Sequence, residues 1–161
     1  MRSTLFAMMA VLTLVCPAGA FAAGGGADPQ PAAQIKPVDP NFVQAKTMIE
    51  AKNYKGALPL LQQVVAKEPK NADAYNLLGF ATRKSGDPNG SLQYYNYALT
   101  LDPKHLGANE YIGEAYLQLD RPQEAQQHLA RLDTLCTFGC TEYRMLKAAI
   151  ADYKAGKKPT N

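Results

Sequence analysis

The chain has 161 residues, of which 47% are hydrophobic and 19% are charged. This composition excludes wholesale disorder, because it allows a sizeable core to be buried. The formal net charge is only +3, without the concentrated basic face of a nucleic-acid binder, and three cysteines are too few for a disulfide-scaffolded miniprotein.

The N-terminus has the pattern of a secretory signal peptide. Arg2 precedes an apolar run over residues 5–15, and small residues follow that run. A positive charge, an apolar run of about ten residues and an Ala-x-Ala site are together typical of such a signal. The sequence therefore predicts a signal peptide over 1–22, cleaved after Ala22 or, as a second choice, after Ala20.

This signal determines the compartment that we expect. Cys16 raises the question of a lipoprotein, which is less favoured because Val15 stands where a small residue is usual. The apolar run is shorter than the about 20 residues that span a bilayer, and no second run of that length follows. We expect a periplasmic or secreted protein without a membrane span.

Two segments are expected to lack fixed structure. Residues 23–38 contain three consecutive glycines and three prolines, so they have little apolar surface to bury and are predicted to form a flexible tether. Residues 156–161 are predicted to form a disordered tail.

A spacing of 34 residues recurs through most of the chain. Small residues repeat at this interval, large apolar residues follow at a helical period, and prolines stand where helices would begin or end. Columns at this spacing are Ala45, Gly79 and Gly113; Ala57, Ser91 and Ala125; and Leu61, Tyr95 and Leu129. Each unit is predicted to be two antiparallel helices joined by a tight turn. Neighbouring units must stack, because one hairpin cannot bury its apolar face alone.

These units resemble tetratricopeptide repeats. The family pattern has a large residue, Leu-Gly and Tyr at fixed offsets, then Ala, an aromatic residue and Pro. The second unit matches it best, with Tyr75, Leu78, Gly79, Ser91, Tyr95, Ala98 and Pro103. The third unit has Ile112, Gly113, Tyr116, Ala125 and Leu129, and the first departs from the pattern in its leading helix.

The resemblance implies an all-α fold, a right-handed superhelical stack of three helix hairpins with a C-terminal capping helix. The expected repeat domain covers 39–155, with repeats 38–71, 72–105 and 106–139 and a capping helix over 140–155. The family consists mostly of protein-interaction scaffolds. The implied function is a non-catalytic adaptor of the periplasm or cell envelope that binds a peptide or helix of another protein in its concave groove.

The sequence offers little for catalysis. It contains no Ser/His/Asp set that stands out by spacing, no phosphate-binding glycine loop and no His-Glu-x-x-His motif. We therefore predict no enzyme, no cofactor, no metal and no catalytic residue. His105 and His128 are interpreted as solvated surface residues, with His128 on the outer face of a helix.

Cys136 and Cys140 enclose Thr-Phe-Gly where an inter-repeat turn is expected. In an oxidising compartment the pair can persist as a disulfide that fastens the third hairpin to the capping helix. A redox dithiol and a soft metal site are the alternatives. The two-residue spacing of thioredoxin-like motifs is missing, and Thr141 stands where haem attachment needs a histidine. The competing function is a thiol-redox or metal-handling protein that uses these two cysteines.

The resemblance also points to groove residues, since the leading helices of this family line the concave face. The corresponding positions hold Lys46, Asn76, Phe80, Arg83, Glu110, Tyr111, Glu114 and Arg144. Phe42 and Phe80 replace members of the Lys/Asn set with which some relatives hold a C-terminal carboxylate, so we expect no such clamp. An aromatic surface with an arginine and two glutamates better suits an amphipathic segment that carries basic residues.

Overall fold

The computed structural model describes residues 37–159. Within this range the chain forms seven α-helices and no strand: α1 (Pro40–Glu50), α2 (Tyr54–Lys67), α3 (Ala72–Lys84), α4 (Pro88–Leu101), α5 (Leu106–Gln118), α6 (Pro122–Leu135) and α7 (Thr141–Lys154). None of these helices is long and apolar enough to cross a bilayer. The predicted signal peptide and nearly all of the predicted tether lie outside the described residues.

The helices begin where the sequence supplies caps. The side chains of Asp39, Asn53, Asn71 and Asp87 each accept a hydrogen bond from a backbone N–H in the first turn of the helix that follows. Each bond satisfies one of the N–H groups that a helix start leaves without a partner. Three of the helices also have proline in their first turn, where its missing N–H costs nothing.

The turn inside each hairpin uses an uncommon backbone conformation. Lys52, Gly86 and Asp120 have φ angles of 59°, 103° and 58°. These values fall in the left-handed region, which favours glycine. The three residues are 34 positions apart (86 − 52 = 120 − 86 = 34), so the turn geometry repeats with the helices. A lysine and an aspartate in two of the three places obscured this column in the sequence.

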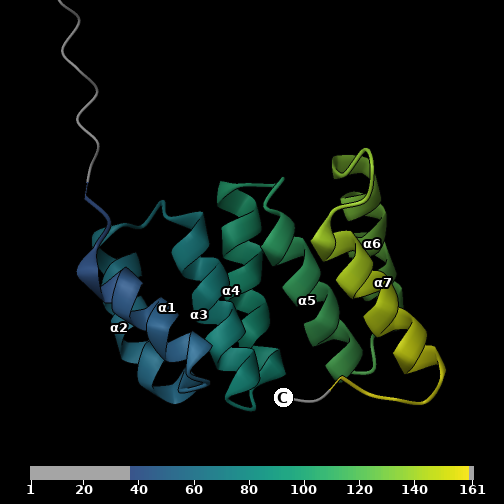
Figure 1. Ribbon diagram of the computed structural model, residues 1–161, viewed down its shortest axis with the longest axis horizontal. Helices are drawn as coiled ribbons and strands as arrows, with labels where there is room; N and C mark the ends of the chain where they lie inside the picture. The colour runs from purple at the N-terminus through teal and green to yellow at the C-terminus, as the bar shows by residue number, and fades with distance from the viewer. Residues whose placement is uncertain (1–36, 160–161) are drawn as a thin grey trace, which may run out of the picture. The chain divides into compact units, whose positions relative to one another are not determined.

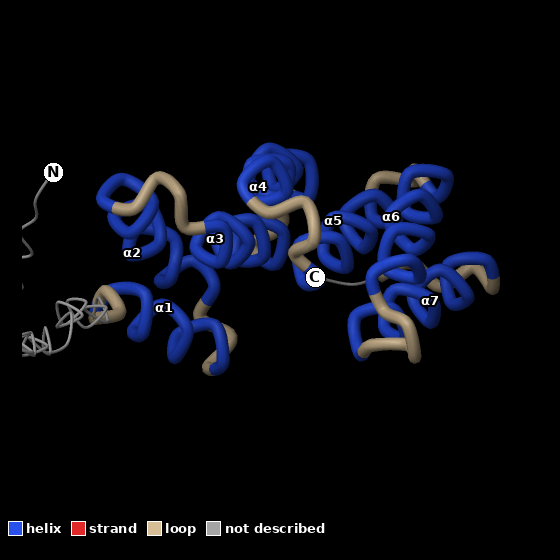
Figure 2. The backbone as a smooth tube through the Cα atoms, turned by 90° about the horizontal axis from the view of Figure 1, so that it is seen from above, coloured by secondary structure: helices blue, strands red, loops and turns tan. Residues whose placement is uncertain are grey.

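The seven helices stack in order along the chain. Each helix packs against the next, and α3 also contacts α5, which in turn contacts α7. In Figure 2 the described residues form an arc, with α2, α4 and α6 on its outer side and α1 and α7 at the two ends of its inner side. Figure 1 views this inner face, with α3 and α5 between α1 and α7. The predicted all-α stack of three hairpins and a C-terminal helix is confirmed.

Two glycines allow the helices of this stack to approach closely. A Cβ at Gly79 would lie 2.7 Å from Cε1 of Tyr95, and a Cβ at Gly113 would lie 2.6 Å from Cδ2 of Leu146. Both distances are shorter than a carbon–carbon contact permits, and both large side chains are fully buried. The small-residue column therefore joins α3 to α4 within a hairpin and α5 to α7 across the last interface.

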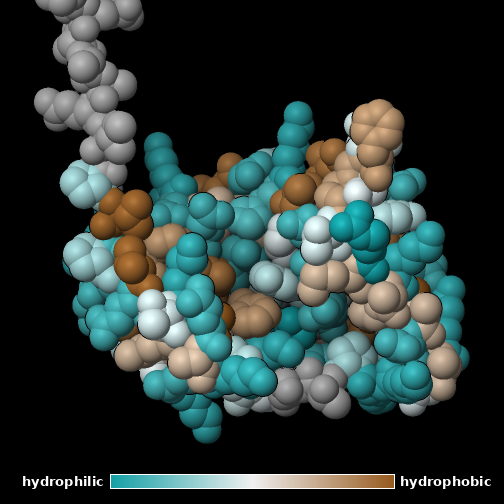
Figure 3. All heavy atoms as spheres, viewed as in Figure 1, coloured by the Kyte–Doolittle hydropathy of each residue, from teal (hydrophilic) through white to brown (hydrophobic). Residues whose placement is uncertain are grey.

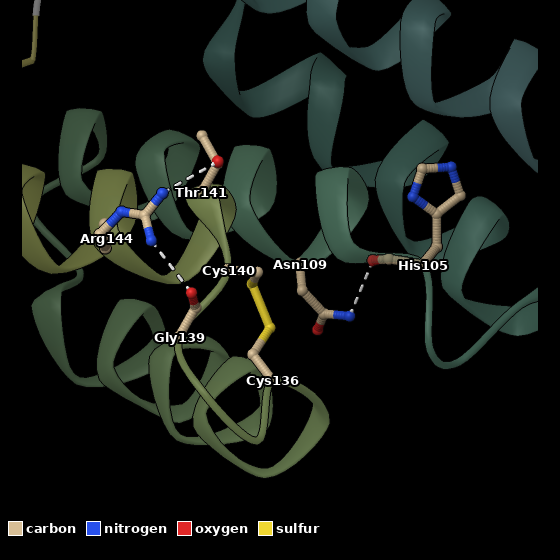
Figure 4. Close-up of a disulfide and its surroundings, with 7 residues drawn as sticks. All are labelled: His105, Asn109, Cys136, Gly139, Cys140, Thr141 and Arg144. Carbon is tan, nitrogen blue, oxygen red and sulfur yellow. Dashed lines mark hydrogen bonds between the residues drawn. A yellow bond between two sulfur atoms is a disulfide. The ribbon is translucent and has the colours of Figure 1, made fainter.

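A disulfide joins Cys136 and Cys140, as predicted, between the end of α6 and the start of α7. Their Cα atoms are 5.5 Å apart, and Gly139 makes the reversal with a φ of 74°. Arg144 fastens the same loop, since its Nη1 donates to the Gly139 carbonyl at 3.0 Å and its Nη2 to Thr141 Oγ1 at 3.2 Å (Figure 4). The loop between the two helices is thus closed by a covalent bond and by one arginine.

The interpretation of both histidines as solvated surface residues is wrong. His105 caps α5, because its Nδ1 accepts from the Ala108 N–H at 3.1 Å, and its Nε2 faces Asp73 Oδ1 at 3.0 Å. His128 is half-buried, with Nδ1 3.0 Å from Asn109 Oδ1. Burial, together with the charge of Arg131, lowers the pKa of His128 to about 4, so this side chain is neutral at pH 7. Both residues thus connect neighbouring helices.

Part of the predicted disordered tail is described and contacts the body of the domain. Lys158 Nζ lies 2.5 Å from Asp120 Oδ2, and the Tyr153 hydroxyl donates to Asp120 Oδ1 at 3.1 Å. Gln118 Nε2 donates to the Pro159 carbonyl at 3.3 Å. These contacts bring residues 158–159 back to the end of α5 and the turn between α5 and α6.

Candidate functional site

The inner face of the arc is the candidate site, because it gathers the residues that the sequence singled out. Figure 3 shows this face hollowed between α1 and α7, with hydrophobic side chains among hydrophilic ones. The eight predicted groove residues all come from the odd-numbered helices: Lys46 from α1; Asn76, Phe80 and Arg83 from α3; Glu110, Tyr111 and Glu114 from α5; and Arg144 from α7.

Three aromatic rings, one from each repeat, lie in a row that we call the aromatic row: Tyr54, Phe80 and Tyr111. The Tyr54 and Phe80 rings meet edge to face with centroids 5.9 Å apart, and the Phe80 and Tyr111 centroids are 4.8 Å apart. All three side chains are half-buried, so part of each ring stays accessible. Such pairs rigidify one another and provide an apolar surface for a ligand.

Arg83 lies beside the aromatic row and is fully buried. Its Nε donates to the Tyr95 hydroxyl at 3.4 Å, and its Nη2 lies 2.6 Å from Glu114 Oε2. Its guanidinium carbon is 5.6 Å from the centroid of the Phe80 ring. Burial alone would lower the pKa of Arg83, but Tyr95 and Glu114 raise it overall, so the side chain stays charged. The arginine therefore links α3, α4 and α5 at the centre of the inner face.

Glu110 is buried next to this ion pair and is only 2% exposed. Burial raises the pKa of Glu110 to about 8, and the carboxylates of Glu114 and Glu142 act in the same direction. The charge of Arg83 opposes this shift without reversing it. Glu110 is consequently protonated for the most part at pH 7, unlike an ordinary surface glutamate.

Three polar atoms on the inner face lack a hydrogen-bond partner within residues 37–159: Asn76 Oδ1, Arg83 Nη1 and Glu110 Oε1. Their side chains are 6%, 0% and 2% exposed. A buried polar group without a partner costs about 1–3 kcal/mol. Such groups persist where a ligand, water or another chain can satisfy them. Asn76 and Glu110 also occupy the same place in successive repeats, since 110 − 76 = 34.

The remaining predicted residues lie at the two ends of the groove. Lys46 is exposed and, with Phe42, Asp73, Asn76 and Leu77, lines a pocket of about 230 Å³ between α1 and α3. Arg144 is exposed on α7, where its guanidinium holds the disulfide loop. The structure thus groups Phe80, Arg83, Glu110, Tyr111 and Glu114 closely and separates Lys46 and Arg144 from them.

Sequence reasoning missed two residues of this site. Tyr54 completes the aromatic row from the start of α2, a helix that was not expected to face the groove. Glu142 acts on Glu110 from the first turn of α7. Its only signal in the sequence was an acidic residue in the first turn of the expected capping helix.

Comparison with known proteins agrees with this architecture. Two family models described as tetratricopeptide repeat match residues 42–105 and 82–150. A solved structure of MamA 41-end from Desulfovibrio magneticus RS-1 is 28% identical with a TM-score of 0.57, covering 59% of this chain and 54% of that chain. A MamA AMB-1 structure is 26% identical with a TM-score of 0.56, covering 65% and 57%. The match therefore spans a little over half the length of MamA.

A structure of PcrH in complex with the chaperone binding region of PopD has a higher TM-score of 0.64 at 17% identity. It covers 72% of this chain and 90% of that chain, and at this identity it supports the fold alone. No curated protein matches the chain.

Proposed function

The chain belongs to the tetratricopeptide repeat family, and on this premise we propose that it is a non-catalytic scaffold that binds a segment of another protein in its concave groove. One observation carries the proposal: the inner face combines the aromatic row with buried polar atoms that lack partners in the described range. Aromatic rings anchor an apolar side chain, and unsatisfied polar groups orient a bound chain. A protein ligand is compatible with this fold, since the PcrH structure of the same fold was solved in complex with the chaperone binding region of PopD.

We also propose that the protein works in the periplasm or is secreted, as the signal pattern of its first 22 residues predicts. The disulfide supports this proposal, because disulfides persist in oxidising compartments. N-terminal sequencing of protein from the cell envelope should give Ala23, or Phe21 as the second choice. An intact Met1 on protein from the cytoplasm would contradict export.

We do not propose thiol-redox or metal chemistry for the cysteine pair. The pair closes the loop between α6 and α7 at the end of the stack, whereas the aromatic row comes from α2, α3 and α5. Within residues 37–159 no group of three His, Cys, Asp or Glu side chains could hold a metal ion.

Phe80→Ala tests the scaffold proposal. Phe80 is the central ring of the aromatic row, so its removal should weaken partner binding at least tenfold, or about 1.4 kcal/mol. Partners are captured from the cell envelope on the immobilised protein, and the affinity of each purified partner for parent and variant is measured by calorimetry. Phe138→Ala is the matched control, because Phe138 is 99% exposed at the tip of the disulfide loop and its loss leaves the inner face intact.

Two results of the binding measurements would contradict the groove. A partner that binds the folded Phe80→Ala variant as tightly as the parent does not use this groove. If Phe138→Ala alone weakens binding, the partner docks on the disulfide loop and the proposed groove is wrong.

A further inference from the structure

Three carboxyl groups converge at the centre of the inner face, and we call them the acidic pocket: Glu110, Glu114 and Glu142. Glu110 and Glu114 stand one helical turn apart on α5, and Glu142 comes from the first turn of α7, which packs against α5. Glu110 lies at the floor, since it is only 2% exposed, whereas Glu114 and Glu142 are half-buried. The pocket therefore has a deep carboxyl group and two carboxyl groups nearer to solvent.

The charges around the pocket do not balance an ionised Glu110. Among residues 37–159, Arg83 is the cation that acts on Glu110, and it is already paired with Glu114 at 2.6 Å and bonded to the Tyr95 hydroxyl. Arg144, the nearest basic residue in sequence to Glu142, is held by the carbonyl of Gly139. While Glu110 is protonated, the carboxylates of Glu114 and Glu142 are offset by Arg83 and by Lys84, which acts on Glu114 from α3, and ionisation of Glu110 would add one uncompensated negative charge.

The deep carboxyl group also lacks a partner. Glu110 Oε1 is buried and has no hydrogen-bond partner in the described part of the chain. A positively charged donor placed against it would supply the missing hydrogen bond and would offset the negative charge of the pocket at the same time. The half-buried Tyr111 ring beside it offers an apolar face for the aliphatic stem of such a donor.

We propose that the acidic pocket receives a lysine or arginine side chain of the bound partner. This inference rests on the proposed scaffold function and deepens it, because it specifies the chemistry of one partner residue. The aromatic row then holds an apolar residue of the same segment. A partner segment that carries an apolar residue and a basic residue on one face meets both requirements.

Seating a cation should release a proton. Glu110 holds its proton at pH 7 when the pocket is empty, because its pKa is raised to about 8. The groups facing it are Glu114 and Tyr111 on α5, Arg83 on α3 and Glu142 on α7, and an added cation among them favours the ionised form. The pKa of Glu110 therefore falls on binding. Affinity should rise with pH up to about 8 and level off above it.

The test measures the titration of Glu110 with a defined probe. The full chain is labelled with ¹³C at the glutamate carboxyl carbons and titrated from about pH 5 to about pH 10 by NMR. The probes are N-acetyl-arginine methylamide and its uncharged analogue N-acetyl-citrulline methylamide at equal ionic strength. The Glu110 signal is the one lost in Glu110→Gln, a substitution that resembles the protonated side chain. Glu124→Gln is the matched control on α6.

Without a probe, one glutamate signal should titrate near pH 8. The arginine probe should lower this midpoint by at least about one pH unit, a tenfold change in proton affinity, and the citrulline probe should leave it in place. An unchanged midpoint with the arginine probe, or an equal shift with the citrulline probe, overturns the proposal. A midpoint in the ordinary range of glutamate without any probe overturns it as well.

These outcomes are separable from the proposed function. A partner whose binding depends on Phe80, together with an arginine probe that has no effect, supports the scaffold proposal and contradicts the proposal that the acidic pocket binds a cation. If the arginine probe lowers the titration midpoint of Glu110 but no partner depends on Phe80, the cation pocket is supported and the scaffold proposal is contradicted.

Discussion

Tyr95→Ala is expected to destabilise the domain by about 3–5 kcal/mol, the usual cost of truncating a buried aromatic side chain to alanine. Tyr95 is fully buried in the core cluster of α4 and α5, and its ring fills the space that Gly79 leaves on α3. Its loss opens a cavity at the point where the second hairpin meets the third. Because a domain has only about 5–15 kcal/mol of stability, this variant should unfold at a much lower urea concentration.

Tyr95→Phe separates the ring from the hydroxyl. The phenylalanine keeps the packing against Gly79 and removes the hydroxyl that accepts from Arg83 Nε. The expected loss is about 1.5–3 kcal/mol, the cost of one hydrogen bond to a charged group. Urea unfolding followed by circular dichroism measures both variants. If Tyr95→Phe loses as much as Tyr95→Ala, the ring does not carry the packing that we assign to it.

The stack could be predicted from the sequence because close packing requires residues of the same size to recur at a fixed interval. Gly79 and Gly113 recur at 34 residues since a Cβ at either place would collide with a buried side chain of another helix. Tyr95, which recurs with Leu61 and Leu129 at the same interval, fills the space opposite Gly79. These contacts depend on residue size alone, so a single sequence reveals them.

The centre of the site could be predicted only in part. The family pattern pointed to Arg83, Glu110 and Glu114, but it placed them on the groove surface, whereas the structure buries Arg83 and Glu110 beneath the half-exposed aromatic row. How deep a polar side chain lies depends on the curvature of the arc and on the rotamers of its neighbours. The 34-residue period records neither. The same reason hid Tyr54, which reaches the groove from an outer helix.

Arg83→Met removes the cation at the centre of the inner face and should cost about 3–5 kcal/mol, as for other buried ion pairs that lose one partner. The methionine fills much of the space of the arginine stem. It leaves Glu114, whose side chain is 19% exposed, without its ion pair, and the Tyr95 hydroxyl without its donor. Glu114→Gln removes the negative charge of the same ion pair, so it leaves the buried guanidinium without a full counter-charge.

The double variant Arg83→Met, Glu114→Gln distinguishes a coupled pair from two independent losses. Each single change leaves the other side chain without its ion-pair partner, whereas the double change leaves no unpaired charge. The double variant should therefore lose less free energy of unfolding than the sum of the two single variants, by about 1–3 kcal/mol. Chemical unfolding of the four proteins at one pH completes the cycle. Strictly additive losses would mean that the 2.6 Å contact between these two side chains contributes nothing to stability.

The same substitution changes the titration of Glu110 in a predictable direction. In the described part of the chain, Arg83 is the group that lowers the pKa of Glu110, against burial and two carboxylates that raise it. In Arg83→Met the NMR midpoint of Glu110 should therefore move above its parent value near pH 8.

Because the folded-state pKa of Glu110 lies above its unfolded value, the stability that its proton provides is complete below about pH 4.5 and is lost as the pH rises through 8. Stability should thus fall with rising pH in the parent, continue to fall to a higher pH in Arg83→Met, and vary least in Glu110→Gln. A Glu110 midpoint that stays in place without Arg83 would place the arginine too far from the acidic pocket to influence it.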